Sequence, residues 1–298
     1  MTEAWLVQGN ATARKVAERR GAHGLKLTGA GTEFLFYSAH KGQQPEGYRI
    51  PRSLLFETAN NPGVLALELQ RKEMKLCMWA TENGLPSSRP IDLIEQDDVP
   101  VLITEIINDD GSVISAGALG SLLADMHRLP PPESVQSNLK HQRNYAYIAA
   151  RMSLRYEKLR VKNSLPLLPP RKRIDGILEE SLHRSSLLHM DIRRQNIRSQ
   201  HGQPLALFDW SNALIGAPDL EMARIEEYAA IAENGLDYSG ILAGYLKSGG
   251  ILNQSPMAWT LLRLDAALML AGVFNSVAPD QTLEELFLAR IRALLRTL

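Results

Sequence analysis

The chain of 298 residues is long enough for one large domain or two lobes with apolar cores. Its 33 basic and 33 acidic side chains leave no net charge, so composition gives no reason to expect nucleic acid or a membrane as a partner. The single cysteine, Cys77, excludes an internal disulfide, and neither a signal peptide nor a membrane-spanning apolar run is evident. These features predict a cytoplasmic protein.

The N-terminal part of the chain shows strand chemistry after a short helix predicted for residues 10–20. The apolar runs LKL, FLFY and YRI predict three strands joined by turns. The first of these turns contains Gly29, Gly31 and Thr32. Backbone N–H groups of such a turn can bind the phosphates of a nucleotide, although most glycine-bearing turns only connect strands.

Two charged residues in this part form a candidate pair. Arg49 lies on the third predicted strand, and Glu73 lies on a helix predicted for residues 61–83, with Pro62 in its first turn. Glu73 could hold the Arg49 guanidinium towards nucleotide phosphates. Taken singly, Arg49 is more simply a solvated charge on a strand, and Glu73 is also consistent with an exposed glutamate on a helix.

Helical periodicity dominates after residue 109, where the composition of the chain changes. The segment 137–174 contains ten Lys or Arg residues and one acidic residue, Glu157. This segment is either a solvated helix face or a surface that attracts an acidic peptide or protein. No nucleic-acid-binding motif accompanies it, so we expect no nucleic acid as a partner.

The stretch from 187 to 221 carries the strongest chemical pattern in the chain. Asn196 follows Asp191 by five residues and His189 by seven, and Asp209 follows the apolar run LALF. Phosphoryl transfer needs a carboxylate to accept a hydroxyl proton and oxygen ligands to hold magnesium over the phosphates. The spacing predicts that Asp191, Asn196 and Asp209 converge within one supersecondary unit.

These residues resemble the signature of the aminoglycoside phosphotransferase / choline kinase-like family. HMDIRRQNI, LALFDW and IGAPDLEMA match a catalytic loop H-G-D-x-x-x-x-N followed by I-D-W and G-D-P-x-x-D-L-A segments. The resemblance implies an α+β, bilobal protein-kinase-like fold. It places a small N-lobe with an antiparallel sheet and a helix at residues 1–108, and a larger, mainly helical C-lobe at 109–298.

The resemblance also implies ATP and Mg2+ as cofactors and gives roles to individual residues. Asp191 would be the catalytic base, and Asn196 and Asp209 would be magnesium ligands. Arg193 could touch the transferred phosphate. The nucleotide phosphates would be bound by Gly29, Gly31, Thr32, Arg49 and Glu73. The adenine edge would be bound at the hinge between the two lobes, by Glu105 and Ile107.

Several positions depart from the family pattern. Met190 stands where the family has glycine, Arg49 where it has lysine, and Ala217 where it has aspartate. Glu221 replaces another aspartate and is expected to support the loops. Because the predicted base and both metal ligands are present, we expect an active enzyme.

The sequence is compatible with three interpretations of the acceptor and of the activity. A hydroxyl group of a small molecule is the leading interpretation. The alternative is a serine or threonine of a peptide, as in lanthipeptide- or thioamitide-like biosynthesis, where the basic segment 137–174 would bind an acidic leader. A pseudokinase that serves as a binding module is the third interpretation.

Overall fold

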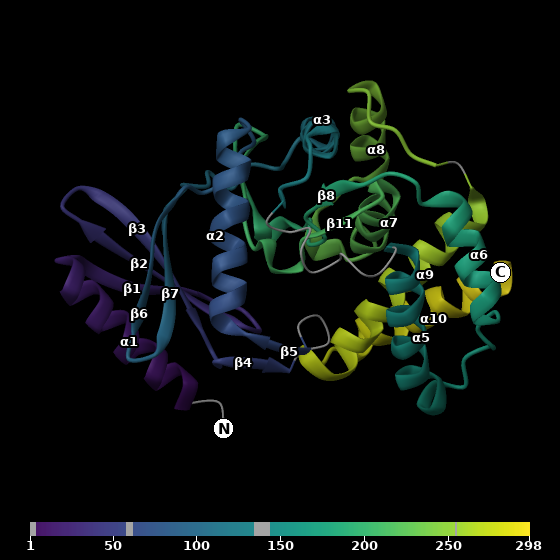
Figure 1. Cartoon of the computed structure of the whole chain (residues 1–298), viewed down its shortest axis with the longest axis horizontal. Coiled ribbons are helices and arrows are strands. Elements are labelled where there is room, and N and C mark those ends of the chain that lie inside the picture. The colour runs from purple at the N-terminus through teal and green to yellow at the C-terminus, as the bar shows by residue number, and fades with distance from the viewer. Residues whose placement is uncertain (1–3, 58–61, 134–143, 254) are drawn as a thin grey trace. The chain divides into compact units, whose positions relative to one another are not determined.

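The computed structural model describes residues 4–57, 62–133, 144–253 and 255–298 (Figure 1). This part of the chain divides into two compact units. Unit 1 comprises residues 1–112 with 198–200 and 205–212, and unit 2 comprises residues 113–197, 201–204 and 213–298. As a division into domains, the predicted boundary between residues 108 and 109 stays a prediction.

Unit 1 is built on an antiparallel five-stranded sheet with the strand order β1-β2-β3-β7-β6. The apolar runs predicted as strands lie in this sheet, so that prediction is confirmed. The strands are β1 (His23–Ala30), β2 (Phe34–Lys41), β3 (Gln44–Pro51), β6 (Pro90–Gln96) and β7 (Val99–Glu105). A separate pair consists of β4 (Leu55–Glu57) and β5 (Pro62–Leu65).

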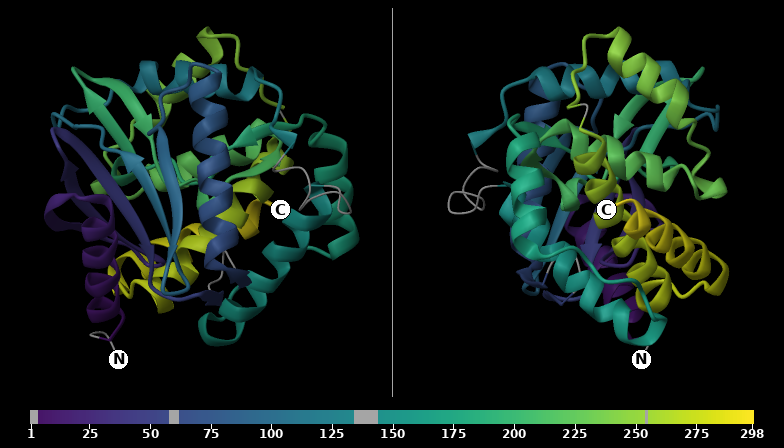
Figure 2. Two further views of the ribbon diagram at one scale, coloured as in Figure 1. Left: turned by 60° about the vertical axis from the view of Figure 1, so that its left-hand side comes forward. Right: turned by 90° about the vertical axis from the view of Figure 1, so that its right-hand side faces the viewer.

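Two helices cover opposite faces of this sheet, because successive side chains of a strand point to opposite sides. Leu35 and Tyr37 of β2 pack with the core residues of α1 (Ala4–Arg20). Phe34 packs instead with Ala66 and Leu69 of α2 (Ala66–Glu82). Figure 2 shows the sheet between the two helices.

Two predicted helix boundaries in unit 1 are wrong. The first helix begins at Ala4 rather than at residue 10. The second begins at Ala66, and Pro62 opens strand β5 instead of the first helical turn. Residues 62–65 are not helical because they pair with β4 as strand β5. The local sequence pattern does not reveal this pairing.

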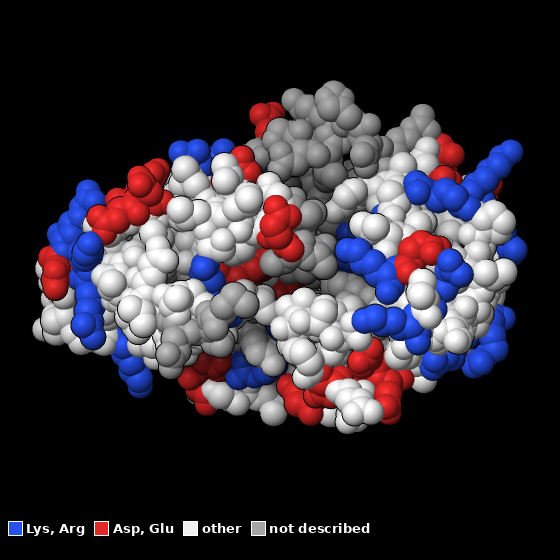
Figure 3. All heavy atoms as spheres, turned by 90° about the horizontal axis from the view of Figure 1, so that it is seen from below, with Lys and Arg blue, Asp and Glu red and all other residues white. Residues whose placement is uncertain are grey.

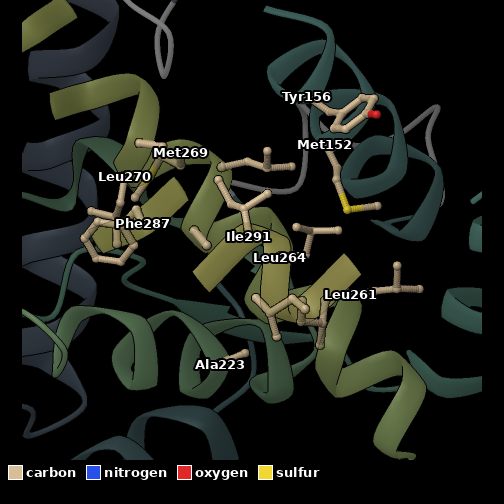
Figure 4. Packing of buried hydrophobic residues seen from close by; sticks show 14 of the residues in the cluster. Met152, Tyr156, Ala223, Leu261, Leu264, Met269, Leu270, Phe287 and Ile291 are labelled. Carbon is tan, nitrogen blue, oxygen red and sulfur yellow. The ribbon is translucent and has the colours of Figure 1, made fainter. Parts of the chain in front are cut away.

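Unit 2 is mainly helical, and α9 lies at the centre of its core. The side chains of Leu264 and Ala267 on α9 are fully buried, and Phe287 and Ile291 of α10 belong to the same apolar cluster (Figure 4). The helices are α3 (Ala116–Arg128), α5 (Asn144–Asn163), α6 (Arg171–Ser181), α7 (Pro218–Tyr228), α8 (Tyr238–Lys247), α9 (Pro256–Gly272) and α10 (Gln281–Thr297).

Short strands support the loop region between α6 and α7. In unit 2, β8 (Ser186–Leu188) pairs antiparallel with β11 (Leu214–Gly216). A second two-stranded sheet pairs β9 (Ile197–Gln200) with β10 (Gln203–Leu207). This pair of strands lies between Asn196 and Asp209 in the chain.

Within the described residues, one segment, Pro256–Val277, is long and apolar enough to cross a membrane by length and composition. Its mean hydropathy is 1.5, and 61% of its apolar window is buried inside the structure. The segment contains α9, and the central helix of an apolar core has the same composition.

Helix α3 approaches α8 so closely that one glycine is sterically required. A Cβ atom at Gly120 would lie 2.1 Å from the main-chain oxygen of Ile241 and 2.6 Å from the main-chain nitrogen of Tyr245. Since both atoms belong to the backbone of α8, a neighbouring side chain cannot relieve the clash. The close approach matters for the site because α3 also carries His127.

We therefore expect Gly120→Ala to lower the free energy of unfolding of unit 2 by about 1–3 kcal/mol through overpacking. Gly117→Ala on the same helix is the matched control, because a Cβ there meets no atom within 4 Å. The control should be neutral or gain at most about 1 kcal/mol of helix propensity. Urea unfolding of both variants measures the difference, and equal stabilities would contradict the predicted close packing.

Candidate active site

The predicted catalytic loop, residues 189–196, lies in unit 2, follows β8 and ends in a 3-10 turn at Arg194–Asn196. The side chain of Asp191 is almost completely buried. Its Oδ2 accepts a 2.7 Å hydrogen bond from Nδ2 of Asn196 and lies 3.2 Å from Nη2 of Arg193. Its Oδ1 accepts a 2.7 Å bond from the hydroxyl of Tyr228. The structure thus brings three of the predicted residues together and adds a fourth.

Met190 in this loop adopts a left-handed backbone conformation with φ of +65°. Its main-chain N–H donates to Oε1 of Glu221, and its carbonyl oxygen accepts from Arg224. Glu221 also contacts Nε2 of His127 through its Oε2, at 2.8 Å. These contacts agree with the expectation that Glu221 supports the loop.

A second cluster lies within unit 1 and is organised by Arg49. The guanidinium of Arg49 stacks on the ring of Phe34, 3.4 Å from its centroid. Nη1 donates to Oε1 of Gln70 at 2.9 Å. Nη2 donates to Oδ1 of Asp209 at 3.0 Å and to Oγ of Ser211 at 2.7 Å. Arg49 is 5% exposed, so this network fixes the guanidinium beside the predicted metal ligand.

The predicted pair of Arg49 and Glu73 is present, with 3.9 Å between Nη2 and Oε2. Glu73 makes a shorter contact, because its Oε2 accepts the main-chain N–H of Trp210 at 2.8 Å. Burial raises the pKa of the Glu73 carboxyl to about 7. Beside it, Lys72 donates to the main-chain oxygen of Ser211, and burial lowers the pKa of its ammonium group to about 8.

The turn between β1 and β2 contains the predicted phosphate-binding residues Gly29, Gly31 and Thr32. Neither glycine has a positive φ, and a Cβ at either position would meet no atom closer than 3.4 Å. The main-chain N–H of Gly31 donates to the carbonyl oxygen of Phe34 at 2.8 Å. The geometry of the turn therefore tolerates other residues at both positions, and Thr32 is exposed at its tip.

The predicted hinge follows the end of β7. The main-chain N–H of Glu105 donates to the carbonyl oxygen of Arg89, and the carbonyl oxygen of Glu105 accepts from Oγ of Ser88. Both main-chain groups of Glu105 are thus bonded within unit 1. Ile107 is half-buried and lies beyond the strand. The adenine-binding roles of both residues stay predictions.

The side chains at the predicted magnesium positions fit a hard cation. Nδ2 of Asn196 is committed to Asp191, so the amide oxygen is the ligand atom that this side chain would offer. Asp209 supplies a carboxylate, and 27% of its side chain is exposed. Within the described residues, no group of three or more His, Cys, Asp or Glu side chains is arranged to hold a metal ion. Magnesium needs no such group, since one or two protein oxygens, waters and substrate phosphates complete its shell.

The two halves of the predicted constellation belong to different units. Asp191 and Asn196 lie in unit 2, and Asp209 lies in unit 1. Their convergence around one nucleotide stays a prediction.

The basic segment is partly internal. Arg155 lies 2.8 Å from Oδ1 of the fully buried Asp265, and Arg151 also pairs with that carboxylate. Lys140 and Arg143 lie outside the described residues. The exposed basic side chains on α5 and α6 are Lys158, Arg160, Lys162, Arg171, Lys172 and Arg173. On the face drawn in Figure 3, Lys and Arg occur in small groups with Asp and Glu between them.

Sequence reasoning did not identify Tyr228, Arg224, Gln70 or Lys72 as part of the site. Arg224 and Tyr228 follow Glu221 at intervals of three and seven residues, which places all three on one helix face. That spacing was the available signal. Gln70 and Lys72 carry no comparable signal, because their contacts come from the packing of α2 within unit 1. Gln70 contacts Arg49 of β3, and Lys72 contacts Ser211.

The comparisons with known proteins agree with this fold. One solved structure that matches is the macrolide 2'-phosphotransferase MphH from Brachybacterium faecium, at 17% identity and a TM-score of 0.59, covering 95% of this chain and 97% of that one. Another is a variant of the aminoglycoside phosphotransferase APH(4)-Ia in complex with AMP-PNP and hygromycin B, at 12% identity and a TM-score of 0.63, covering 96% and 98%. These likenesses confirm the predicted α+β kinase-like fold.

The sequence decides the family. No curated protein matches the chain. The model of the phosphotransferase enzyme family, APH, matches residues 53–252, which is more than half of the chain. The chain therefore belongs to the phosphotransferase enzyme family and is a kinase that transfers phosphate to a hydroxyl acceptor.

Proposed function

We propose that this kinase transfers the γ-phosphate of ATP to a hydroxyl group of a small molecule, with Mg2+ as its metal cofactor. The observation that carries the proposal is the buried Asp191 carboxylate, held by Asn196 and Tyr228. Its loop resembles the family signature and lies within the residues 53–252 that match the family model. A carboxylate held in this way is suited to accept a proton from an alcohol.

In the proposed reaction, Asp191 takes the proton of the acceptor hydroxyl as the acceptor oxygen forms a bond to the γ-phosphorus. The bond between that phosphorus and the β,γ-bridging oxygen breaks, and its electron pair leaves with ADP. Asn196 and Asp209 would hold Mg2+, which supplies charge neutralisation for the phosphate oxygens. Arg193, which lies 3.2 Å from Asp191, would contact the transferred phosphate.

The other predicted contacts would bind the nucleotide. Arg49, with Glu73 near it, would face the phosphates next to Asp209, its partner in the structure. The turn with Gly29, Gly31 and Thr32 would cover those phosphates. Main-chain groups of the segment from Glu105 to Ile107 would bind the adenine edge.

A small-molecule acceptor is supported by the names of the structural relatives. One is named for macrolides, and another contains hygromycin B. At 12–17% identity these names suggest a class of acceptor, an alcohol of modest size, rather than a particular compound. A cytoplasmic location is part of the same proposal.

A peptide acceptor is the second candidate, and the exposed basic residues on α5 and α6 are the observation that favours it. They would attract an acidic leader segment. Incubation with labelled ATP against panels of small alcohols and of serine- or threonine-containing peptides, read by mass, distinguishes the two. Phosphorylation adds one HPO3 unit, which is a mass gain of about 80 Da. If only peptides showed this gain, and no small alcohol did, the small-molecule proposal would be overturned.

Nucleotide binding can be tested without knowledge of the acceptor. We expect ATP with magnesium to stabilise the protein by about 2.7 kcal/mol at 100 times its dissociation constant, because a ligand that binds only the folded state shifts the equilibrium. A thermal-shift titration with and without magnesium measures this effect. Absence of any shift under both conditions would favour the pseudokinase interpretation instead.

A further inference from the structure

Three polar side chains on one face of α7 make hydrogen bonds to the catalytic loop. Glu221, Arg224 and Tyr228 are spaced by three and four residues, so their side chains leave the same side of the helix. Glu221 accepts from the N–H of Met190, and Arg224 donates to the carbonyl oxygen of Met190. Tyr228 then donates to the side chain of Asp191, the next residue of the loop.

The loop needs this support because Met190 occupies a backbone region that disfavours residues with a Cβ atom. Its φ is +65°, where glycine would be unstrained. Such a conformation persists when the surroundings over-determine it. Here both main-chain groups of Met190 are bonded to α7, and its side chain, 1% exposed, packs in the core of unit 2.

The bond from Tyr228 sets the direction of the Asp191 carboxylate. Tyr228 is buried, and burial together with the nearby Asp191 charge raises the pKa of its hydroxyl, so it stays a donor at neutral pH. Oδ1 accepts from Tyr228, whereas Oδ2 accepts from Asn196. The two oxygens therefore have different donors, which disfavours rotation of the carboxylate. Since each oxygen carries two lone pairs, one more hydrogen bond from an acceptor hydroxyl can still be accommodated.

We propose that Tyr228 is a positioning residue, which orients the carboxylate of Asp191 towards the acceptor hydroxyl through its 2.7 Å hydrogen bond. The inference rests on the proposed function, because it assigns Asp191 as the base. It adds to the reaction a residue that follows the last segment resembling the family signature, IGAPDLEMA, and it explains why α7 presents a buried hydroxyl to the loop.

The test compares Tyr228→Phe with Tyr156→Phe, two variants that each lose one buried hydroxyl in unit 2. Tyr156 is 2% exposed, and its hydroxyl donates to the carbonyl oxygen of Pro166, also at 2.7 Å (Figure 4 shows Tyr156). Hydrolysis of ATP, with water as the acceptor, supplies kcat and the KM for ATP. We expect Tyr228→Phe to lower kcat by about 10- to 100-fold, as misplaced catalytic groups do, with the KM for ATP unchanged. Tyr156→Phe should keep the wild-type kcat while its Tm falls similarly.

Crystal structures of the wild type and of Tyr228→Phe give a readout that does not depend on turnover. The carboxylate of Asp191 should have one orientation in the wild type and more than one in the variant. A single, unchanged orientation in Tyr228→Phe, or equal kcat values in the two variants, would overturn the positioning role. Failure of the wild type to bind or hydrolyse ATP would instead overturn the proposed function, whereas the structural comparison would still decide the role of Tyr228.

Discussion

Replacing Asp191 with asparagine is expected to lower kcat by about 100- to 10,000-fold, the range over which a general base contributes. The amide has no oxygen basic enough to take the proton of the acceptor hydroxyl. Nucleotide affinity should remain near that of the wild type, since Asp191 is not among the predicted metal ligands. Phosphate transfer or hydrolysis of labelled ATP gives kcat, and calorimetric titration gives the dissociation constant.

The asparagine variant also disturbs the loop, and the control takes this into account. Both carboxylate oxygens of Asp191 accept hydrogen bonds, so the amide nitrogen must face a donor from Tyr228 or Asn196. We expect a loss of stability of about 1–3 kcal/mol from that conflict. Asp125→Asn, on the exposed side of α3, makes the same chemical change and should leave kcat unaltered. Turnover near the wild-type value in Asp191→Asn would remove the assignment of the base.

Replacing Asp209 with alanine is expected to abolish the magnesium dependence of ATP binding. The variant loses a predicted metal ligand and the carboxylate that Arg49 contacts at 3.0 Å. With the metal site incomplete, the stabilisation of about 2.7 kcal/mol at 100 times the wild-type dissociation constant should disappear. Titration of the variant with ATP, in magnesium and in EDTA, should yield the same weak affinity.

The backbone at this position requires its own control. Asp209 has a φ of +63°, so alanine there carries a conformational cost of about 1 kcal/mol in addition to the loss of the carboxylate. Asp98 has the same φ of +63°, in the exposed turn between β6 and β7 of the same unit. Asp98→Ala should therefore lose similar conformational stability and keep magnesium-dependent binding. If magnesium still enhanced ATP binding in Asp209→Ala, the ligand assignment would be wrong.

The sheet of unit 1 and the helical character of unit 2 followed from local patterns. Runs such as FLFY predicted the strands, and in β2 the buried residues alternate with less buried ones from Leu35 to Ala39. The start of α2 did not follow, because residues 62–65 pair with β4. A strand pair formed between two separate segments can override a helical pattern, since its hydrogen bonds are absent from the local sequence.

The basic segment shows a second limit of local reading. Arg151 and Arg155 fit a charged helix face, yet both turn towards Asp265, which is more than a hundred residues away in the chain. A buried carboxylate must be paired, and its partners are decided by which helix packs against it. The count of basic residues in the segment therefore exceeds the number of positive charges that it exposes to solvent.

By itself, the sequence indicated the family and supplied the candidates for the base and the metal ligands, because the spacing of Asp191, Asn196 and Asp209 is a property of one continuous stretch. Only the tertiary structure decided how that stretch is held. Glu221, Arg224 and Tyr228 reach the loop from a helix 31 to 37 residues further along the chain, and Arg49 reaches Asp209 across 160 residues. Contacts at such separations depend on how the elements pack, and no local spacing encodes the orientation that packing gives to a carboxylate.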